Sequence, residues 1–200
     1  MIKAIFLDLD NTLVPASHLH KDAFIKAVKE FTGIEISNNF HDNFLDGLPT
    51  KKKLRFISDI PVEKHESISS RKQELTIQLI EEKIHNDPSK VELLIKLKLS
   101  EYKVACVTNA IRKTAKLMLE RTGIWPYFDL LISNEDVVKS KPNPEPYFKA
   151  MSYFDVPSCQ CLAVEDNYNG IDSAKRAGIK VWEVSGPDEV IWSNIQKYLE

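Results

Sequence analysis

The sequence of 200 residues is poor in cysteine and lacks the paired spacing of a metal-binding cysteine set. Two of its three cysteines, Cys106 and Cys161, stand in apolar stretches typical of strands, so we expect small core residues rather than a disulfide framework. The third, Cys159, forms a Cys-x-Cys with Cys161, but no second pair follows. A zinc site, which takes four ligands when structural, is therefore not expected.

The chain also lacks an excess of charge of either sign and an apolar run of membrane length. Its formal net charge is -2 and its pI about 6.2, so it carries no basic excess to hold nucleic acid, and any phosphorylated ligand should be small. No apolar stretch approaches the roughly 20 residues that span a bilayer, and the chain enters its first apolar run without a signal-peptide pattern. We expect a soluble, cytoplasmic protein without a membrane partner, as a monomer or weak dimer.

The first apolar run, Ile2 to Leu7, ends abruptly in acids at Asp8 and Asp10. Such a run is typical of a buried parallel strand whose carboxyl end opens into a site. While the strand stays extended, the two acids face the same side and repel each other unless a cation lies between them. Mg²⁺ prefers oxygen ligands of this kind. For the two acids alone, a solvated turn or a helix cap remains the alternative.

After residue 87 the sequence alternates between strand-like and helix-like stretches. Asp87 and Pro88 suit the N-cap and the first position of a helix. The alternation favours an α/β fold, with a doubly wound parallel sheet covered by helices on both faces. We expect strands over 103–108, 130–133, 161–165 and 181–184, and helices over 88–97, 111–122, 144–154, 170–177 and from 187 onward.

The segment between the first strand and Asp87 has only helical patterns. A helix with apolar residues at helical spacing ends at Gly33, a short helix over 50–58 follows with Thr50 as its expected cap, and a longer helix covers 62–85. No stretch there resembles a buried parallel strand. We therefore expect a core formed by 1–14 and 88–200, interrupted by an all-helical insertion over 15–87.

Polar residues follow two of the later strands directly. Thr108 and Asn109 stand where a strand passes into a helix, and free backbone N–H groups at a helix start suit a phosphate. Simple capping of that helix is the alternative. Farther on, prolines stiffen the loop after Lys141, so that this lysine is presented from a fixed position and can neutralise a phosphate. Lys139, outside the rigid segment, is the weaker candidate.

Two acids, Glu165 and Asp166, end a further strand and repeat the arrangement of Asp8 and Asp10. Anions at neighbouring strand ends again require a shared cation. N-capping of the next helix by Asp166 or Asn169 is the alternative.

The four stretches together, each after a strand, resemble the four motifs of the haloacid dehalogenase (HAD) superfamily. These are D-x-D-x-T at the start, the Thr108 junction, the Lys-Pro-x-Pro loop, and Glu165-Asp166 followed by Asn169-Gly170. The last is particularly similar to the subfamily of phosphoglycolate phosphatases and β-phosphoglucomutases. The resemblance implies a Rossmann-like core with a helical cap inserted after the first motif.

The resemblance also implies a role for each motif residue. Asp8 is the expected nucleophile and Asp10 the general acid/base, while Thr108, Asn109 and Lys141 are expected to bind the phosphoryl group. Mg²⁺ is the expected cofactor. Its expected ligands are Asp8, Asp166, the backbone carbonyl of Asp10 and, through a water molecule, Glu165.

Asp10 favours phosphate esters, because relatives that cleave carbon–halogen bonds generally lack this second acid. Among phosphate-ester chemistries, a phosphosugar mutase is the first alternative to a phosphatase for a small metabolite such as a sugar phosphate. His20, Lys72 and the loop containing Gly47 resemble the substrate-binding positions of such mutases, but Thr50 stands where they have an arginine. Without that arginine, the second phosphate group of a mutase substrate would be held less firmly by the insertion, and this favours a phosphatase. The second alternative is a non-catalytic phosphate-binding protein, in which Asp10 would have no use.

Overall fold

The computed structural model describes residues 1–45 and 48–199, and these residues form two compact units. The first unit comprises Met1–Pro15 and Ile84–Glu200, and the second comprises Ala16–Lys83. Among the described residues, no helix has the length and apolar character needed to cross a membrane.

The first unit is built on a parallel sheet of five strands in the order β3-β2-β1-β4-β5. The predicted doubly wound α/β fold is therefore confirmed, with the first strand of the chain at the centre of the sheet. All four residues of that central strand are buried, as its apolar sequence predicts. The strands are β1 (Ala4–Leu7), β2 (Lys103–Val107), β3 (Leu130–Ile132), β4 (Cys161–Glu165) and β5 (Lys180–Glu183).

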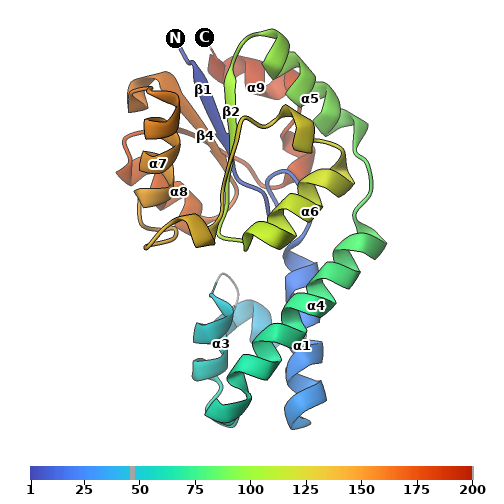
Figure 1. Ribbon diagram of the computed structural model, residues 1–200. Helices are drawn as coiled ribbons and strands as arrows, with labels where there is room; N and C mark the ends of the chain where they lie inside the picture. The colour runs from blue at the N-terminus through green and yellow to red at the C-terminus, as the bar shows by residue number, and fades with distance from the viewer. Residues whose placement is uncertain (46–47, 200) are drawn as a thin grey trace. The chain divides into compact units, whose positions relative to one another are not determined.

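Helices cover both faces of this sheet (Figure 1). On one face, α7 (Glu145–Phe154) and α8 (Tyr168–Arg176) pack against Phe6 and Ala163. The other face carries α5 (Pro88–Leu99) and α9 (Trp192–Leu199), and α6 (Arg112–Thr122) follows β2. Apart from the exposed Lys103 at the start of β2, the side chains of the inner strands β1, β2 and β4 are thus buried on both faces. Cys106 and Cys161 are buried free thiols, as expected from their apolar surroundings.

The last helix begins later than the sequence predicts. A single 3₁₀ turn covers Pro187–Glu189, and α9 starts only at Trp192. The Pro187 carbonyl accepts a hydrogen bond from the Val190 N–H at 2.9 Å and another from the Lys90 ammonium at 2.7 Å. Because both bonds hold that carbonyl in a tight turn, the helix does not propagate from the proline.

The second unit consists of helices, and its described residues include no strand. Phe24, Leu54 and Ile68 are among the buried residues that form its core. The helices are α1 (Ser17–Thr32), α2 (Asn38–Phe40), α3 (Thr50–Phe56) and α4 (His65–Lys83), with a π-helical turn at His41–Leu45 and a 3₁₀ turn at Val62–Lys64.

Thr50 does not cap α3, so that prediction was wrong. Pro49 occupies the N-cap position, and its carbonyl accepts hydrogen bonds from the N–H groups of Lys52 and Lys53 at 2.8 and 3.0 Å. Thr50 is therefore already the first helical residue. The extended backbone of Pro49 suits the position before a helix, because the proline has no N–H to lose there.

The chain re-enters the first unit at Ile84, earlier than the predicted boundary at residue 88. The Ile84 carbonyl accepts a hydrogen bond from Arg121 at 3.2 Å, and the Asp87 N–H donates to the Thr122 carbonyl at 3.1 Å. Both partners belong to the last turn of α6. Hydrogen bonds to that turn thus attach residues 84–87 to the α/β unit.

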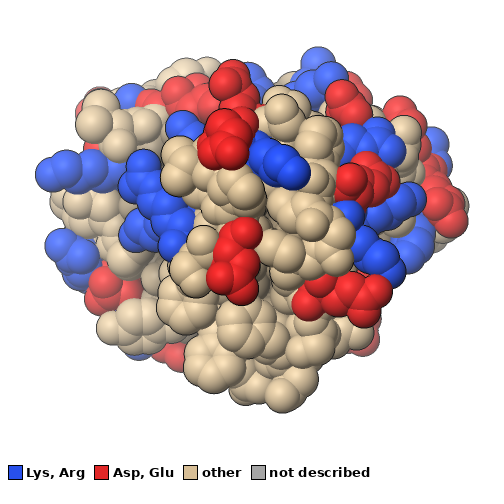
Figure 2. Space-filling model, turned by 90° about the horizontal axis from the view of Figure 1, so that it is seen from below, with Lys and Arg blue, Asp and Glu red and all other residues tan. Residues whose placement is uncertain are grey.

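Surface charge is mixed on the face that Figure 2 shows, where basic and acidic side chains are interspersed with neutral ones. Several pairs form ion pairs at the surface, for example Arg71 with Glu30 at 2.7 Å. This face carries no broad field of positive charge of the kind that would hold a nucleic acid backbone.

Replacing Asp87 tests the predicted start of α5. Its Oδ1 accepts hydrogen bonds from the N–H groups of Ser89 and Lys90 at 2.9 and 3.3 Å, so Asp87→Ala should lower the free energy of unfolding by about 1 kcal/mol. Urea titration measures the change. The matched control is Asp22→Ala at an exposed position of α1, which should change stability by less than about 0.5 kcal/mol.

The same pair of variants gives a pH test. Partial burial acts to raise the pKa of Asp87, but hydrogen bonds from Ser89 and Lys90 outweigh it and lower that pKa below its ordinary value. The cap therefore stabilises the fold at neutral pH, and this contribution is lost as the pH falls below about 3.9 through the folded-state pKa. Wild type and Asp87→Ala should converge in stability in acid. An equal difference at every pH would contradict an ionised cap.

Candidate active site

The register of the central strands places Asp8 and Glu165 opposite each other. Phe6 of β1 pairs with Ala163 of β4, and both face the same side of the sheet. Alternation of side chains then brings Asp8 and Glu165, each two residues farther on, to that same side at the carboxyl edge. The Asp8 N–H donates to the Val164 carbonyl at 3.1 Å, which continues the pairing past the end of β1.

The turn after β1 is fixed by its own backbone. The Val14 N–H donates to the Leu9 carbonyl at 3.0 Å, and Asn11 adopts a left-handed conformation with φ of 61°. Asparagine tolerates this conformation better than most residues. Within the turn, the hydroxyl of buried Thr12 donates to Asp166 Oδ1 at 3.1 Å. The turn thereby joins the first acidic pair to the second, although they are far apart in the sequence.

The Lys141 ammonium occupies the space between Asp8 and Glu165. It is 5% exposed and donates to Asp8 Oδ1 at 2.8 Å, to Glu165 Oε1 at 2.5 Å and to the Val107 carbonyl at 2.5 Å. An ammonium group has three N–H donors, so these acceptors satisfy it completely. The predicted preference for Lys141 over Lys139 agrees with this geometry, because Lys139 is exposed.

The loop that presents Lys141 is held by Asn109. The Asn109 side chain accepts from the Lys141 N–H at 3.0 Å and donates to the Lys141 carbonyl at 3.1 Å. Asn109 thus does not cap α6, whose N-cap position belongs to Ile111. Thr108 is buried, and its hydroxyl accepts from the Ala110 N–H at 3.0 Å. The phosphate contacts expected of Thr108 and Asn109 stay predictions.

Neither Asp166 nor Asn169 caps α8. The N-cap is Asn167, whose side chain accepts a hydrogen bond from the Gly170 N–H at 3.1 Å. A glycine is needed at position 170, because a Cβ built there would lie 1.9 Å from Glu165 Oε2. The first turn of α8 can pack against the Glu165 carboxylate only without that atom.

The site contains more buried carboxyl groups than positively charged groups. Burial raises the pKa of Asp8 well above its ordinary value; Lys141 opposes this, while Glu165, Asp166 and Asp10 add to it. Burial likewise raises the pKa of Glu165 and of Asp166. Burial acts to lower the pKa of Lys141, but Asp8 and Glu165 outweigh it and hold that pKa above its usual range. One ammonium therefore faces several carboxyl groups.

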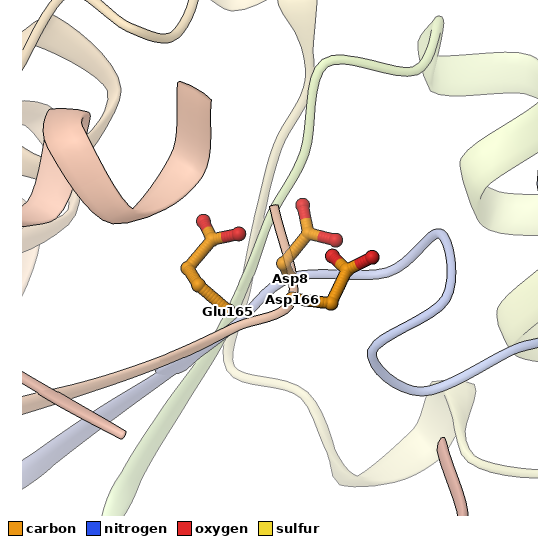
Figure 3. A group of neighbouring side chains, drawn as sticks. All are labelled: Asp8, Glu165 and Asp166. Carbon is orange, nitrogen blue, oxygen red and sulfur yellow. The ribbon is translucent and has the colours of Figure 1, made fainter. Parts of the chain in front are cut away.

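The residues present fit a divalent cation. Carboxylate oxygens of Asp8, Glu165 and Asp166 lie within 4.8 Å of one another, and Figure 3 shows Asp166 beside Asp8 with Glu165 on the opposite side of Asp8. Asp8 Oδ2 is buried, and within the described residues it has no hydrogen-bond partner. A buried anionic oxygen without a donor is costly, and a hard cation would satisfy it. Asp8 and Asp166 could hold Mg²⁺ directly.

The substrate residues expected in the helical insertion belong to the second unit. His20 on α1 and Lys72 on α4 lie together, with Lys72 Nζ 3.0 Å from His20 Nδ1. Thr50 is half-buried at the start of α3. Gly47 lies outside the described residues. The roles expected of these four residues stay predictions.

Three residues that shape the site had no assigned role in the sequence analysis. Thr12 could have been found from the D-x-D-x-T spacing, because its hydroxyl follows Asp10 by two positions. Asn167 is one of several polar residues that could cap α8, and the local sequence does not indicate which of them does so. Tyr147 is buried, and its hydroxyl donates to Glu165 Oε1. The expected helix over 144–154 includes this residue, but the helix pattern gives no role to its hydroxyl.

Comparison with known proteins bears on the family and the fold of this chain. Residues 5–184 match the family model of the haloacid dehalogenase-like hydrolases. The pyrophosphatase PpaX of Bacillus velezensis is 27% identical over 189 residues, covering 92% of this chain and 86% of the relative. The crystal structure of CbbY from Rhodobacter sphaeroides, in complex with phosphate, is 25% identical with a TM-score of 0.81, covering 90% of this chain and 85% of that chain.

A further solved structure shows the same fold. β-Phosphoglucomutase from Clostridium difficile has a TM-score of 0.83 and 22% identity, covering 100% of this chain and 97% of that chain. The resemblance predicted from the four motifs is thus confirmed, as is the prediction of a HAD-type hydrolase enzyme. The chain belongs to the haloacid dehalogenase-like hydrolase family.

Proposed function

We propose that this enzyme is a Mg²⁺-dependent phosphatase that hydrolyses a small phosphorylated metabolite, such as a sugar phosphate, through an aspartyl-phosphate on Asp8. The observation that carries the proposal is the environment of Asp8. One of its oxygens is held by Lys141, and the other is buried without a hydrogen-bond partner among the described residues. A phosphate-containing crystal structure of a similar fold, that of CbbY, supports the class of ligand.

The proposed reaction consists of two displacements at phosphorus. In the first, an Asp8 oxygen forms a bond to phosphorus while the bond between phosphorus and the leaving-group oxygen breaks. Asp10 gives its proton to the leaving-group oxygen. In the second, water attacks the aspartyl-phosphate, Asp10 takes the proton from the water, and the bond to Asp8 breaks. Inorganic phosphate leaves, and both carboxyl groups return to their starting states. Lys141 would offset the negative charge of the phosphoryl oxygens.

Asp8 and Asp166 would hold the metal ion, with the backbone carbonyl of Asp10 and, through a water molecule, Glu165. When bound, Mg²⁺ would supply the positive charge that one lysine cannot provide for several carboxylates and a phosphate. This role fits the raised pKa of Asp8, since burial and neighbouring acids already disfavour its charged form.

A phosphatase is favoured over a mutase by the residue at the start of α3. A mutase must hold a second phosphate while the first is transferred, and an arginine gives the planar, two-pronged contact suited to that task. This chain has Thr50 at that position. The helical unit, with His20 beside Lys72, would act as the cap that selects the substrate. A purely phosphate-binding protein would have no use for Asp10.

A panel of phosphate esters tests the proposed reaction. Phosphate release from sugar phosphates, phosphoglycolate, nucleotides and pyrophosphate is compared with and without a sugar bisphosphate. We expect release from at least one small ester, and no stimulation by the bisphosphate. Isomerisation of a hexose 1-phosphate that depends on the bisphosphate, without net phosphate release, would identify a mutase instead.

Removing Asp166 tests the metal site. Asp166→Asn keeps the size and the oxygen that Thr12 contacts but loses a negative charge, so Mg²⁺ affinity measured by calorimetry should fall by at least about tenfold. The metal-free melting temperature should not fall, because the variant relieves repulsion between acids. The matched control, Asp172→Asn, changes a carboxylate that faces Arg176 on α8. Turnover that persists in excess chelator would contradict the metal requirement.

The two acids of the first motif should fail in different ways. Asp8→Asn removes the nucleophile, so no phosphoenzyme can form. Asp10→Asn keeps the nucleophile but loses acid/base assistance worth roughly 10²–10⁴ in rate. With an aryl phosphate, whose leaving group needs little protonation, Asp10→Asn should therefore accumulate the aspartyl-phosphate. Intact-mass analysis after acid quench should show the adduct on that variant. An adduct on Asp8→Asn would overturn the mechanism.

A further inference from the structure

Tyr147 is a buried polar side chain for which the proposed reaction provides no role. It lies on α7, in the interior of the α/β unit, with its ring 6.1 Å from that of Phe6 between centroids. Its hydroxyl donates to Glu165 Oε1, and the Lys141 ammonium lies 5.4 Å from the centre of its ring. The ring would fill the same space without the hydroxyl, so packing alone does not require a tyrosine.

The hydroxyl contacts the one oxygen that also holds Lys141. Glu165 Oε1 accepts from both Tyr147 and Lys141, and two donors occupy the lone pairs of a carboxylate oxygen. Glu165 Oε2 is buried without a hydrogen-bond partner in the described part of the chain, and it lies against Gly170. The terminal torsion of a glutamate is otherwise broad. Among hydrogen bonds in the described residues, those to Oε1 therefore select the rotation of this carboxylate.

A rotation of Glu165 would move Lys141. The ammonium is shared between Glu165 and Asp8, and its third bond goes to the fixed carbonyl of Val107 at the end of β2. Loss of the Glu165 contact would leave a buried N–H without an acceptor, which is costly, so the ammonium would shift to recover one. The position of the Lys141 ammonium beside Asp8 thus depends on the Tyr147 hydroxyl, which donates to Glu165 and does not bond Lys141 itself.

We infer that Tyr147 is a positioning residue of the active site: its hydroxyl fixes the rotation of Glu165 and thereby keeps the Lys141 ammonium beside Asp8. The hydroxyl touches neither Asp8 nor a substrate and acts through Glu165. The inference uses the proposed phosphatase reaction for its kinetic readout, and the binding of inorganic phosphate provides a readout that does not.

A double-mutant cycle tests this inference. Tyr147→Phe keeps the ring and removes the hydroxyl, whereas Glu165→Met keeps a side chain of similar length but removes the oxygen that accepts from both Tyr147 and Lys141. In the wild-type background, Tyr147→Phe should lower kcat by about 10-fold and weaken binding of inorganic phosphate, measured by calorimetry with Mg²⁺ present, by a similar factor. In the Glu165→Met background it should change neither, because the oxygen through which the hydroxyl acts on Lys141 is absent.

Tyr102→Phe is the matched control, because Tyr102 precedes β2 and lies at the opposite end of that strand from Thr108. It should leave kcat and phosphate binding unchanged. Equal losses from Tyr147→Phe in both backgrounds would overturn the inference, as would no loss in the wild-type background or a Tyr147→Phe protein that does not fold. If wild type releases phosphate from no ester, the proposed function fails, and the phosphate-binding cycle alone decides the role of Tyr147.

Discussion

The shared contact of the Lys141 ammonium with Asp8 and Glu165 is the interaction on which the site depends. Two carboxylates buried at neighbouring strand ends would each carry a heavy desolvation cost if left unpaired. A single ammonium with three satisfied donors offsets part of that cost for both. It does not offset all of it, because Asp8 retains a buried oxygen without a donor among the described residues. The remaining negative charge fits a cation at this site.

The parallel sheet creates this arrangement through register. Because β1 lies at the centre, Asp8 has a neighbour on each side: the end of β2 supplies the Val107 carbonyl, and the end of β4 supplies Glu165. Lys141 comes from a loop outside these strands, and Asn109 fastens that loop to the end of β2 through two hydrogen bonds. Each loop at the carboxyl edge therefore depends on another, which limits the freedom of every side chain in the site.

The sequence predicted those parts of the fold that local patterns determine. All five strands were placed to within one or two residues, since each is an apolar run ended by polar or turn residues. The caps of α3 and α8 were missed because neighbouring residues, Pro49 and Asn167, take those positions, whereas two other differences depend on distant partners. Lys90 bonds the Pro187 carbonyl and delays α9, while α6 draws residues 84–87 into the first unit. In the site, the positions of the motif acids and Lys141 after strands predicted that they lie together, and their roles stay predictions. The hydroxyl of Tyr147 meets Glu165 across the core, and no local pattern encodes that contact.

The two units differ in how far sequence reasoning can extend to function. In the α/β unit, the chemistry is common to any phosphoryl group, so the same few residue types are required whatever the substrate. The helical unit, which we propose selects the substrate, would have to fit one particular leaving group, and many different side chains can do so. The pairing of His20 with Lys72 shows that two polar residues from α1 and α4 meet there. Their chemistry admits several anionic or hydroxylated groups. Reaction type is thus the more predictable property, and substrate choice the less predictable one.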